Sequence, residues 1–317
     1  MPSAAKGASI LDLAAARHAG IVRGEDIDWD RYLTDSDKAQ IVPAESLAEK
    51  AKEQLLLGNE VAEGLSLPWA KCERNVKLRR GKLAVWAGWS RHGKTQMLKQ
   101  VMLHAIKNGE RPLIASMEED IIEVWKDMAR LYVAKDTYTP RELDRFIDFM
   151  RGELWLYDQQ GAVSGDRIQA VIRYAAKELA VTQVVVDSLM MLKVPRDDYD
   201  AQHRFVSALK TTAKDTGTTV HLVAHMRKRD GKGGEDAPGG LHDISGGHEI
   251  GSIADYVFIV WRDMAKKGNH GAMLKVDKQR GAVNWTGTIG LNFHDLSRQF
   301  VEDVHPTRYL DDHGADF

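Results

Sequence analysis

The sequence predicts an α/β protein with a mainly parallel sheet, helices on both of its faces, and an antiparallel extension at its C-terminal end. Three observations support this prediction. Short apolar runs alternate with amphipathic segments of helical spacing. The last three apolar runs follow one another with only polar turns between them. A phosphate-binding pattern lies where a predicted strand meets a predicted helix, which is the context that this pattern requires.

The parallel part of the sheet is predicted from five apolar runs, each associated with a segment that reads as a helix. The run QVVVD at 183–187 is almost uninterrupted valine, as expected of a strand buried on both faces. The pair Asn108-Gly109 is a helix stop signal. We expect parallel strands at 83–87, 112–117, 154–158, 183–187 and 220–224, helices that end near 108, 134, 150, 180 and 216, and antiparallel strands at 256–261, 273–276 and 286–293.

Composition limits the class of protein. With 317 residues, of which 43% are hydrophobic, the chain can bury a substantial core. The formal net charge of −2 gives no general attraction to nucleic acid, so a nucleic-acid site must be a local cluster of Lys and Arg. A single cysteine, Cys72, excludes an intramolecular disulfide and a cysteine-cluster zinc site. Because no apolar run approaches the roughly 20 residues of a membrane span and no signal peptide is recognisable, we expect a cytoplasmic protein.

The residues from Gly88 to Thr95, GWSRHGKT, match the phosphate-loop pattern G-x-x-x-x-G-K-T. Backbone N–H groups of such a loop and the positive end of the following helix bind phosphates, and the glycines leave room for them. Lys94 is expected to reach the outer phosphates, and the Thr95 hydroxyl to be a ligand of Mg²⁺. The alternative is a glycine-containing turn that binds nothing. The residues predicted to bind ATP or another NTP are Gly88, Ser90, Arg91, His92, Gly93, Lys94, Thr95 and Gln96.

Polar residues at the ends of other predicted strands are expected to complete this site, because ligands of open α/β sheets bind at the carboxyl ends of the strands. Asp187 ends the valine strand, where it would hold Mg²⁺ directly or through water. Glu118 would act as the general base towards an attacking water, with Glu119 as the competing candidate. His225 would contact the γ-phosphate. The alternatives are a capping Asp, a solvated acidic turn and a packed histidine.

Taken together, these segments resemble the ring-shaped replicative DNA helicases of the DnaB family, which include the helicase half of phage primase-helicases and mitochondrial Twinkle. GWSRHGKT resembles the Walker A motif, and VVVDSLMML, with Asp187, resembles the Walker B strand. SMEE resembles the segment of the catalytic glutamate, which matches Glu118, and VAHMRKR resembles the γ-phosphate sensor segment, with His225. HDISGGHEIGSIADYVFIVWRD and DKQRGAVNWTGTIGLNF resemble two later motifs.

The resemblance covers about 65–293 and implies a RecA-like P-loop NTPase core at 65–304. An N-terminal arm with a linker helix would occupy 1–64, and a flexible tail would occupy 305–317. The amphipathic segment 44–57 is similar in position to the linker helix that docks on an adjacent subunit, and packing on its own domain is the alternative. The acidic stretch 24–30 is expected to be a loop.

The resemblance also implies residues that act between subunits. In the DnaB family the Lys and Arg of a K-x-R motif project into the ATP site of the next subunit. Lys278 and Arg280 would therefore act in trans, where positive charge stabilises the transferred phosphoryl group. Without the motif match, this segment is a basic β-turn. Arg91 and His92 replace smaller residues that are usual in the family's phosphate loop.

DNA contacts are expected in two basic loops that leave the nucleotide-binding edge of the sheet, one after His225 and one after Asp187. Basic side chains there would hold the phosphates of a single strand with little sequence preference. A solvated basic loop is the alternative. The predicted DNA-binding residues are Arg227, Lys228, Arg229, Lys232, Lys193 and Arg196.

We therefore expect an ATP hydrolase that forms a homo-oligomer, a hexameric ring, and unwinds duplex DNA while it moves along single-stranded DNA. A separate primase or loader is among the partners that the resemblance suggests. The alternative is a RecA- or KaiC-like DNA-binding ATPase, such as a recombination or regulatory factor, that does not unwind DNA. Because fewer than 65 residues precede the core, no primase activity is expected.

Overall fold

The computed structural model describes residues 21–22, 27–33, 52, 64–159, 161, 163–191, 198–227, 237–246, 248–265, 270–281, 285–303 and 305–312. The described helices are α2 (Trp29–Leu33), α4 (Lys94–Lys107), α5 (Ile121–Val133), α6 (Pro140–Met150), α7 (Gly165–Glu178), α8 (Tyr199–Thr216) and α9 (His248–Ile253). The strands are β1 (Ile21–Val22), β2 (Leu65–Ser66), β3 (Lys77–Leu78), β4 (Leu83–Gly88), β5 (Pro112–Ser116), β6 (Trp155–Tyr157), β7 (Gln183–Asp187), β8 (Thr219–His225), β9 (Tyr256–Arg262), β10 (His270–Gln279), β11 (Gly287–His294) and β12 (Gln299–Val301).

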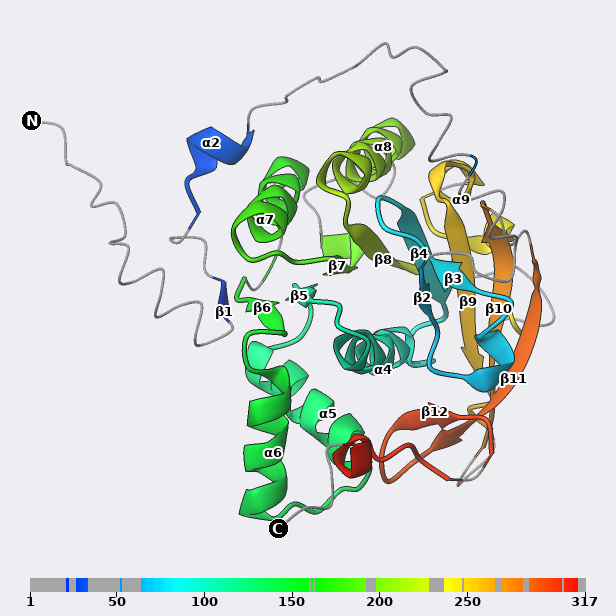
Figure 1. Ribbon diagram of the computed structural model, residues 1–317. Helices are drawn as coiled ribbons and strands as arrows, with labels where there is room; N and C mark the ends of the chain where they lie inside the picture. Colours follow the sequence, from blue (N-terminus) through cyan, green and yellow to red (C-terminus); the bar gives the residue numbers. More distant parts are fainter. Residues whose placement is uncertain are drawn as a thin grey trace, which may run out of the picture.

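The predicted fold class is confirmed. One sheet has the strand order β1-β6-β5-β7-β8-β4-β9-β10-β11-β12, and β2 pairs separately with β3. All neighbours from β1 to β9 run parallel, whereas β9, β10, β11 and β12 pair antiparallel. Figure 1 shows α4, α5 and α6 on one side of this sheet and α7 and α8 on the other. The strand β4 therefore lies in the middle of the sheet, between β8 and β9.

The two faces of the sheet are covered because its central strands are apolar on both sides. Successive side chains of a strand point to opposite faces. In β4, Ala84 and Trp86 belong to the core beneath α4 and α5, whereas Leu83 and Val85 belong to the core beneath α7 and α8. Burial on both faces explains the continuous apolar runs in the sequence.

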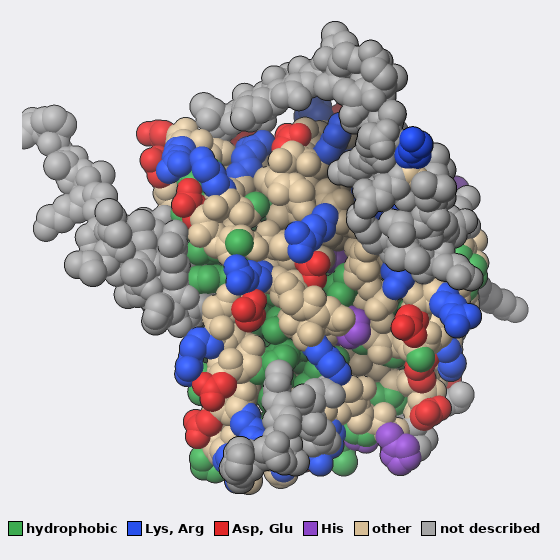
Figure 2. Space-filling model, viewed as in Figure 1, with side chains coloured by type: hydrophobic (Ala, Val, Ile, Leu, Met, Phe, Trp, Pro, Cys, Tyr) green, Lys and Arg blue, Asp and Glu red, His purple; other side chains and the backbone are tan. Residues whose placement is uncertain are grey.

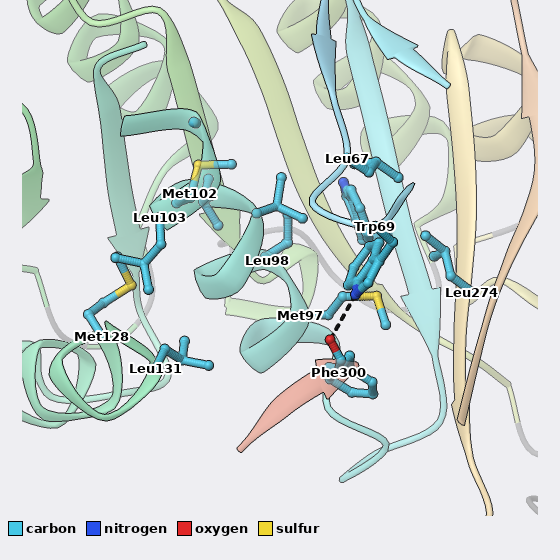
Figure 3. Close-up of a cluster of buried hydrophobic side chains, with 14 of the residues drawn as sticks. Leu67, Trp69, Met97, Leu98, Met102, Leu103, Met128, Leu131, Leu274 and Phe300 are labelled. Atoms are coloured by element: carbon cyan, nitrogen blue, oxygen red, sulfur yellow. Dashed lines mark hydrogen bonds between the residues drawn. The ribbon is translucent and has the colours of Figure 1, made fainter. Parts of the chain in front are cut away.

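The core beneath α4 also joins the beginning and the end of the region 65–303 (Figure 3). The indole N–H of Trp69 donates to the carbonyl oxygen of Phe300 at 2.7 Å. The side chain of Gln100, on α4, donates to the same oxygen at 2.9 Å and accepts from the Phe300 N–H at 2.8 Å. The helix α4 is thereby held between the segment that contains Trp69 and β12.

The five helices predicted between residues 94 and 216 are confirmed, and their C-terminal ends lie within two residues of the expected positions. Side chains that accept from orphan backbone N–H groups cap the first turns of α5, α6, α7 and α8, whereas α4 begins after Gly93 without such a cap. Asp120 caps α5, and Thr139 forms a capping box with Glu142 at the start of α6. Ser164 and Asp198 cap α7 and α8 in the same way.

Two predictions for the ends of the chain were wrong. The acidic stretch 24–30 is not simply a loop, because α2 begins at Trp29, and the Tyr32 hydroxyl donates to Glu178 of α7 at 2.6 Å. The tail after His305 is not loose throughout, because Tyr309 and Leu310 are buried in the core beneath α5. These short segments carry too few apolar residues for a periodic pattern.

The predicted linker helix at 44–57 lies outside the described residues, apart from residue 52. None of the described helices is long and apolar enough to cross a membrane.

Candidate nucleotide site

The phosphate loop is the turn that joins the buried strand β4 to α4. Gly88 lies at the carboxyl end of β4, paired in register with His225 of β8. A Cβ atom at Gly88 would lie 2.4 Å from the carbonyl oxygen of Val260, so only glycine fits there. At Gly93 the φ angle is +89°, and a Cβ would lie 2.8 Å from the Phe300 ring. The two glycines of the motif are therefore required by packing as well as by ligand access.

Lys94 begins α4 and has only 5% of its surface exposed. Its Nζ atom donates to the carbonyl oxygen of Trp89 at 2.9 Å, within the loop itself. Burial lowers the pKa of Lys94 to about 8, against the opposing effect of the Asp187 and Glu118 carboxylates. An anionic phosphate beside this ammonium would stabilise its charged form.

Asp187 ends β7 beside the first turn of α4. Its Oδ2 atom accepts from the Thr95 hydroxyl at 2.6 Å, and its Oδ1 atom is buried without a partner among the described residues. Burial raises the pKa of this carboxyl to about 6, although the Thr95 hydrogen bond lowers it. A hydroxyl and a carboxylate oxygen are hard ligands that suit Mg²⁺. The described residues contain no group of three or more His, Cys, Asp or Glu that could hold a metal, so Mg²⁺ here would need phosphate and water as further ligands.

Glu118 follows β5 and faces the ends of β7 and β8. The Ser188 hydroxyl donates to its Oε1 atom, and Nε2 of His225 lies 3.6 Å from the same oxygen. The contact with His225 is the largest influence on the pKa of Glu118 and lowers it, burial opposes that shift, and Ser188 lowers the pKa further. The carboxylate is therefore ionised near neutral pH and able to accept a proton.

Glu119 is engaged elsewhere. Its carboxylate pairs with Nζ of Lys99, a residue of α4 with only 2% of its side chain exposed. The same ammonium binds Asp127 of α5 at 2.8 Å. Because Lys99 already binds Glu119, the geometry favours Glu118 over its neighbour as the candidate base.

The other predicted nucleotide-binding residues of the loop differ from one another in exposure and in contacts. Ser90 and Arg91 are exposed, and Arg91 has a φ angle of +67°. Gln96 has a buried amide nitrogen without a partner. His92 departs from the prediction, because its ring is buried and its Nδ1 atom accepts from the backbone N–H of Arg262 at 3.1 Å. The His92 ring therefore packs against the end of β9.

Three residues of the site were missed in the sequence. Ser188 contacts Glu118, Lys99 holds Glu119, and the Trp89 indole N–H donates to the carbonyl oxygen of Ala237 at 3.0 Å. Ser188 was detectable, since it directly follows the carboxylate that ends β7. The other two contacts join residues 20 and 148 positions apart, which no local pattern indicates.

Lys278 and Arg280 lie far from the phosphate loop of their own chain. Gln279 pairs with Tyr256, and Tyr256 pairs with Ala84 near the start of β4. Gly88 lies four residues further along that strand, roughly 13 Å away at the usual rise of a strand. The two cations are therefore at the opposite edge of the sheet.

Both cations bind carbonyl oxygens at the C-terminal end of α9. Nζ of Lys278 donates to Gly251 and Ser252 at 2.8 and 2.6 Å, and a guanidinium nitrogen of Arg280 donates to Ser252 at 3.1 Å. Positive charge is favourable at the C-terminal end of a helix. Burial lowers the pKa of Lys278 to about 8, and the nearby Arg280 charge lowers it further.

Of the predicted DNA-binding residues, Arg227 is exposed directly after β8, where its N–H donates to the carbonyl oxygen of Asp243 at 2.8 Å. The others lie outside the described residues: Lys228, Arg229, Lys232, Lys193 and Arg196.

Residues 76–286 match the protein family described as the KaiC ATPase. No curated protein matches the chain by sequence. One similar solved structure is titled as a DnaB-like replicative helicase and its interactions with primase, with a TM-score of 0.68, 16% identity, and coverage of 84% of this chain and 68% of that chain. Another is titled as an ATPase domain, with a TM-score of 0.69, 16% identity, and coverage of 83% of this chain and 99% of that chain. These likenesses confirm the RecA-like ATPase fold and, at the level of the fold, the resemblance to the DnaB family.

Proposed function

The chain belongs to the KaiC ATPase family, and on this basis we propose that it is a ring-forming DNA helicase driven by ATP or another NTP. The observation that carries the proposal is the anchoring of the basic loop after β8. At one end of this loop His225 contacts Glu118, and at the other end Ala237 accepts a hydrogen bond from Trp89 of the phosphate loop. A change at the nucleotide therefore reaches both ends of the segment proposed to hold DNA.

Nucleotide binding is assigned to the phosphate loop and the start of α4. The backbone N–H groups of the loop and Lys94 would hold the phosphates, with the nucleotide displacing the contact between Lys94 and Trp89. Thr95 and the unpartnered oxygen of Asp187 would hold Mg²⁺. When bound, this ion neutralises charge on the phosphate oxygens.

Hydrolysis is assigned to Glu118 as general base. Its ionised carboxylate would take a proton from the attacking water at Oε1 or Oε2. Ser188 and His225 both touch Oε1, and they would fix the orientation of the carboxylate. His225 would also register the presence of the γ-phosphate, since it ends the strand next to Gly88.

Arg280, helped by Lys278, would complete the site of a neighbouring copy. Arg280 is exposed, and its guanidinium has carbonyl oxygen as its partner, so the charge is available to an anion brought by another chain. Catalysis would then require a homo-oligomer, and we propose a hexameric ring around single-stranded DNA. Arg227, Lys228, Arg229, Lys232, Lys193 and Arg196 would line its pore. We place this assembly in the cytoplasm, with a separate primase or loader as partner.

A second candidate is a KaiC- or RecA-like DNA-binding ATPase that does not unwind DNA. The family match favours it, because the matched description names KaiC and no helicase. The nucleotide site and the intersubunit residues would serve both candidates equally.

A strand-displacement assay on a forked DNA substrate separates the two candidates. The wild type should release the labelled strand in the presence of ATP and Mg²⁺, and Lys94→Ala should not. ATP hydrolysis stimulated by single-stranded DNA without displacement would select the second candidate. Absence of ATP hydrolysis in the wild type, with and without DNA, would reject both.

A further inference from the structure

A basic groove lies at the edge of the sheet opposite the phosphate loop. Its volume is about 730 Å³, and its lining includes Lys77, Arg79, Arg80, Lys82 and one carboxylate, Glu110. Lys82 directly precedes β4, and Glu110 lies between α4 and β5, so the groove opens at the amino ends of the parallel strands.

The positive charge of this groove is not balanced within the described part of the chain. Glu110 already accepts from Arg80 at 3.1 Å and from the Gln183 amide at 3.2 Å. No described carboxylate forms an ion pair with the side chains of Lys77, Arg79 or Lys82. Over the face seen in Figure 2, basic and acidic side chains are interspersed. The groove differs from this pattern, because four cations and only one carboxylate line it.

A second observation also indicates excess positive charge at the groove. His104 of α4 lies beside it, with Nε2 at 3.5 Å from the hydroxyl of Ser66, a lining residue. Burial lowers the pKa of His104 to about 4, and the positive charges of Lys107 and Lys77 lower it further.

The groove adjoins the residues proposed to act on a neighbouring copy. A Cβ atom at Gly281 would lie 3.6 Å from the guanidinium of Arg79, and Gly281 directly follows Arg280. The backbone of Arg79 is fixed to the sheet, since its N–H donates to the Tyr256 hydroxyl at 3.2 Å. A partner bound at Arg280 would therefore lie close to Arg79.

The opposite edge of the sheet carries exposed acidic residues. Asp120 caps α5 directly after the Glu118–Glu119 turn, and Glu123 lies in the first turn of the same helix with 62% of its side chain exposed. The Glu123 carboxylate pairs with Lys126 of the same helix at 2.6 Å, but from Glu118 to Lys126 four carboxylates stand against this one cation. One edge of the sheet therefore carries a basic groove, and the other carries an acidic turn beside the nucleotide site.

We propose that the basic groove receives the acidic start of α5 from the next copy of the chain. This inference rests on the proposed function, because it takes Arg280 to reach the phosphate loop of that copy. A contact between two different edges is heterologous, and repetition of such a contact closes a ring or extends a filament. The groove would orient the two copies before Arg280 enters the site, since long-range attraction between opposite charges steers association.

The experiment is a measurement of assembly by sedimentation velocity with ATP and Mg²⁺. The test variant is the double reversal Arg79→Glu/Lys82→Glu, in which neither side chain supports the fold through an ion pair. The control is Arg145→Glu, which reverses an exposed arginine of α6 that lines neither the groove nor the neighbouring pocket that shares Arg80 with it. Circular dichroism melting checks that all three proteins are folded.

The wild type should assemble at about 50 mM NaCl and less at about 500 mM, where the Debye length is shorter. The test variant should assemble at least tenfold more weakly than the wild type at the lower salt, and the control should match the wild type. Equal assembly of the test variant and the wild type would overturn the inference. So would a test variant that assembles normally but loses binding to a labelled oligodeoxythymidine, because the groove would then hold nucleic acid.

Failure of the proposed function gives a different result. If the wild type stays monomeric with ATP, Mg²⁺ and single-stranded DNA, both the trans site and the groove contact are wrong. If mixed Lys94→Ala and Arg280→Ala chains regain ATP hydrolysis while the groove variant assembles normally, only the groove inference is wrong.

Discussion

The two edges of the parallel sheet differ in how they hold their charged groups. At the carboxyl edge, Lys94 and Asp187 are buried, and each has one hydrogen-bond partner within the phosphate-loop region. One oxygen of Asp187 has no partner among the described residues. At the amino edge, Lys278 and Arg280 bind helix carbonyls, and Arg280 remains exposed. The first arrangement leaves binding capacity for a ligand that enters the fold, and the second presents charge to something outside it.

The groups that we propose for phosphoryl transfer are thus divided between two edges of one chain. Parallel pairing of β4 with β9 places the phosphate loop and the end of β10 at opposite edges. A single copy therefore cannot bring Arg280 to its own nucleotide. Four changes test whether the two edges really have these different roles.

The largest effect is expected at the amino edge. Arg280→Ala should lower ATP turnover of the assembled protein about 10³-fold, roughly 4 kcal/mol of transition-state stabilisation, because a trans-acting guanidinium stabilises the developing charge. Arg298→Ala, which removes an exposed arginine paired with Asp127, is the control and should change little.

Mixing two variants tests the same prediction more directly. Chains with Lys94→Ala keep Arg280, and chains with Arg280→Ala keep Lys94, so a mixed assembly contains some complete sites. Turnover of the mixture should exceed that of either variant alone. A mixture no more active than its components, in assemblies shown to contain both chains, would contradict the trans assignment.

At the carboxyl edge, Glu118→Gln should lower the hydrolysis rate about 10²-fold and leave nucleotide binding in place, because the amide cannot accept the proton. Single-turnover hydrolysis and binding of a fluorescent nucleotide measure the two steps separately. Glu119→Gln is the matched control one residue away, and its effect should be on stability, through Lys99. Equal losses of activity in both variants would argue against the assignment of Glu118.

The pH dependence should be bell-shaped, with a smaller effect. Below the pKa of Asp187, about 6, the carboxyl is protonated and loses its capacity to hold Mg²⁺. Above the pKa of Lys94, about 8, the ammonium loses the charge that binds phosphate. Nucleotide affinity should therefore fall roughly tenfold for each pH unit beyond either limit. Titration from about pH 5 to pH 9 checks this, and Asp187→Asn should remove the acid limb alone.

The smallest effect is expected at the contact between the phosphate loop and the basic loop. Trp89→Phe removes the indole N–H that binds Ala237, a hydrogen bond worth about 1 kcal/mol. The ratio of DNA-stimulated to basal ATP hydrolysis should fall a few-fold. Trp125→Phe, on α5, is the control, because its indole N–H has no partner among the described residues. An unchanged ratio in Trp89→Phe would show that this contact does not couple the loops.

Much of the fold follows from local patterns. The valine strand at β7 and the Asn108-Gly109 stop were sufficient to place an element or its end, because each acts through its own backbone. The short strands β1 and β12 were missed, since two or three residues carry no periodic signal and are stabilised only by their neighbours.

The candidate site likewise has a part that the sequence predicted and a part that required the structure. The spacing of Gly88, Gly93, Lys94 and Thr95 indicated a phosphate loop without any knowledge of the fold. The resemblance already favoured Glu118 over Glu119, but the physical reason required the structure, because the partner that engages Glu119 is Lys99 on another element. The burial of His92 could not be predicted from the sequence either, since its ring accepts a hydrogen bond from a backbone N–H of β9, 170 residues later.

Local sequence was enough to indicate a phosphate-binding loop, because a strand, a glycine turn and a helix start are set by backbone sterics and hydrogen bonding between near neighbours. The edge of the sheet at which each charge lies depends on the tertiary structure. Strand order and direction arise from contacts between residues far apart in the chain, and they place Lys94 and Arg280 at opposite edges.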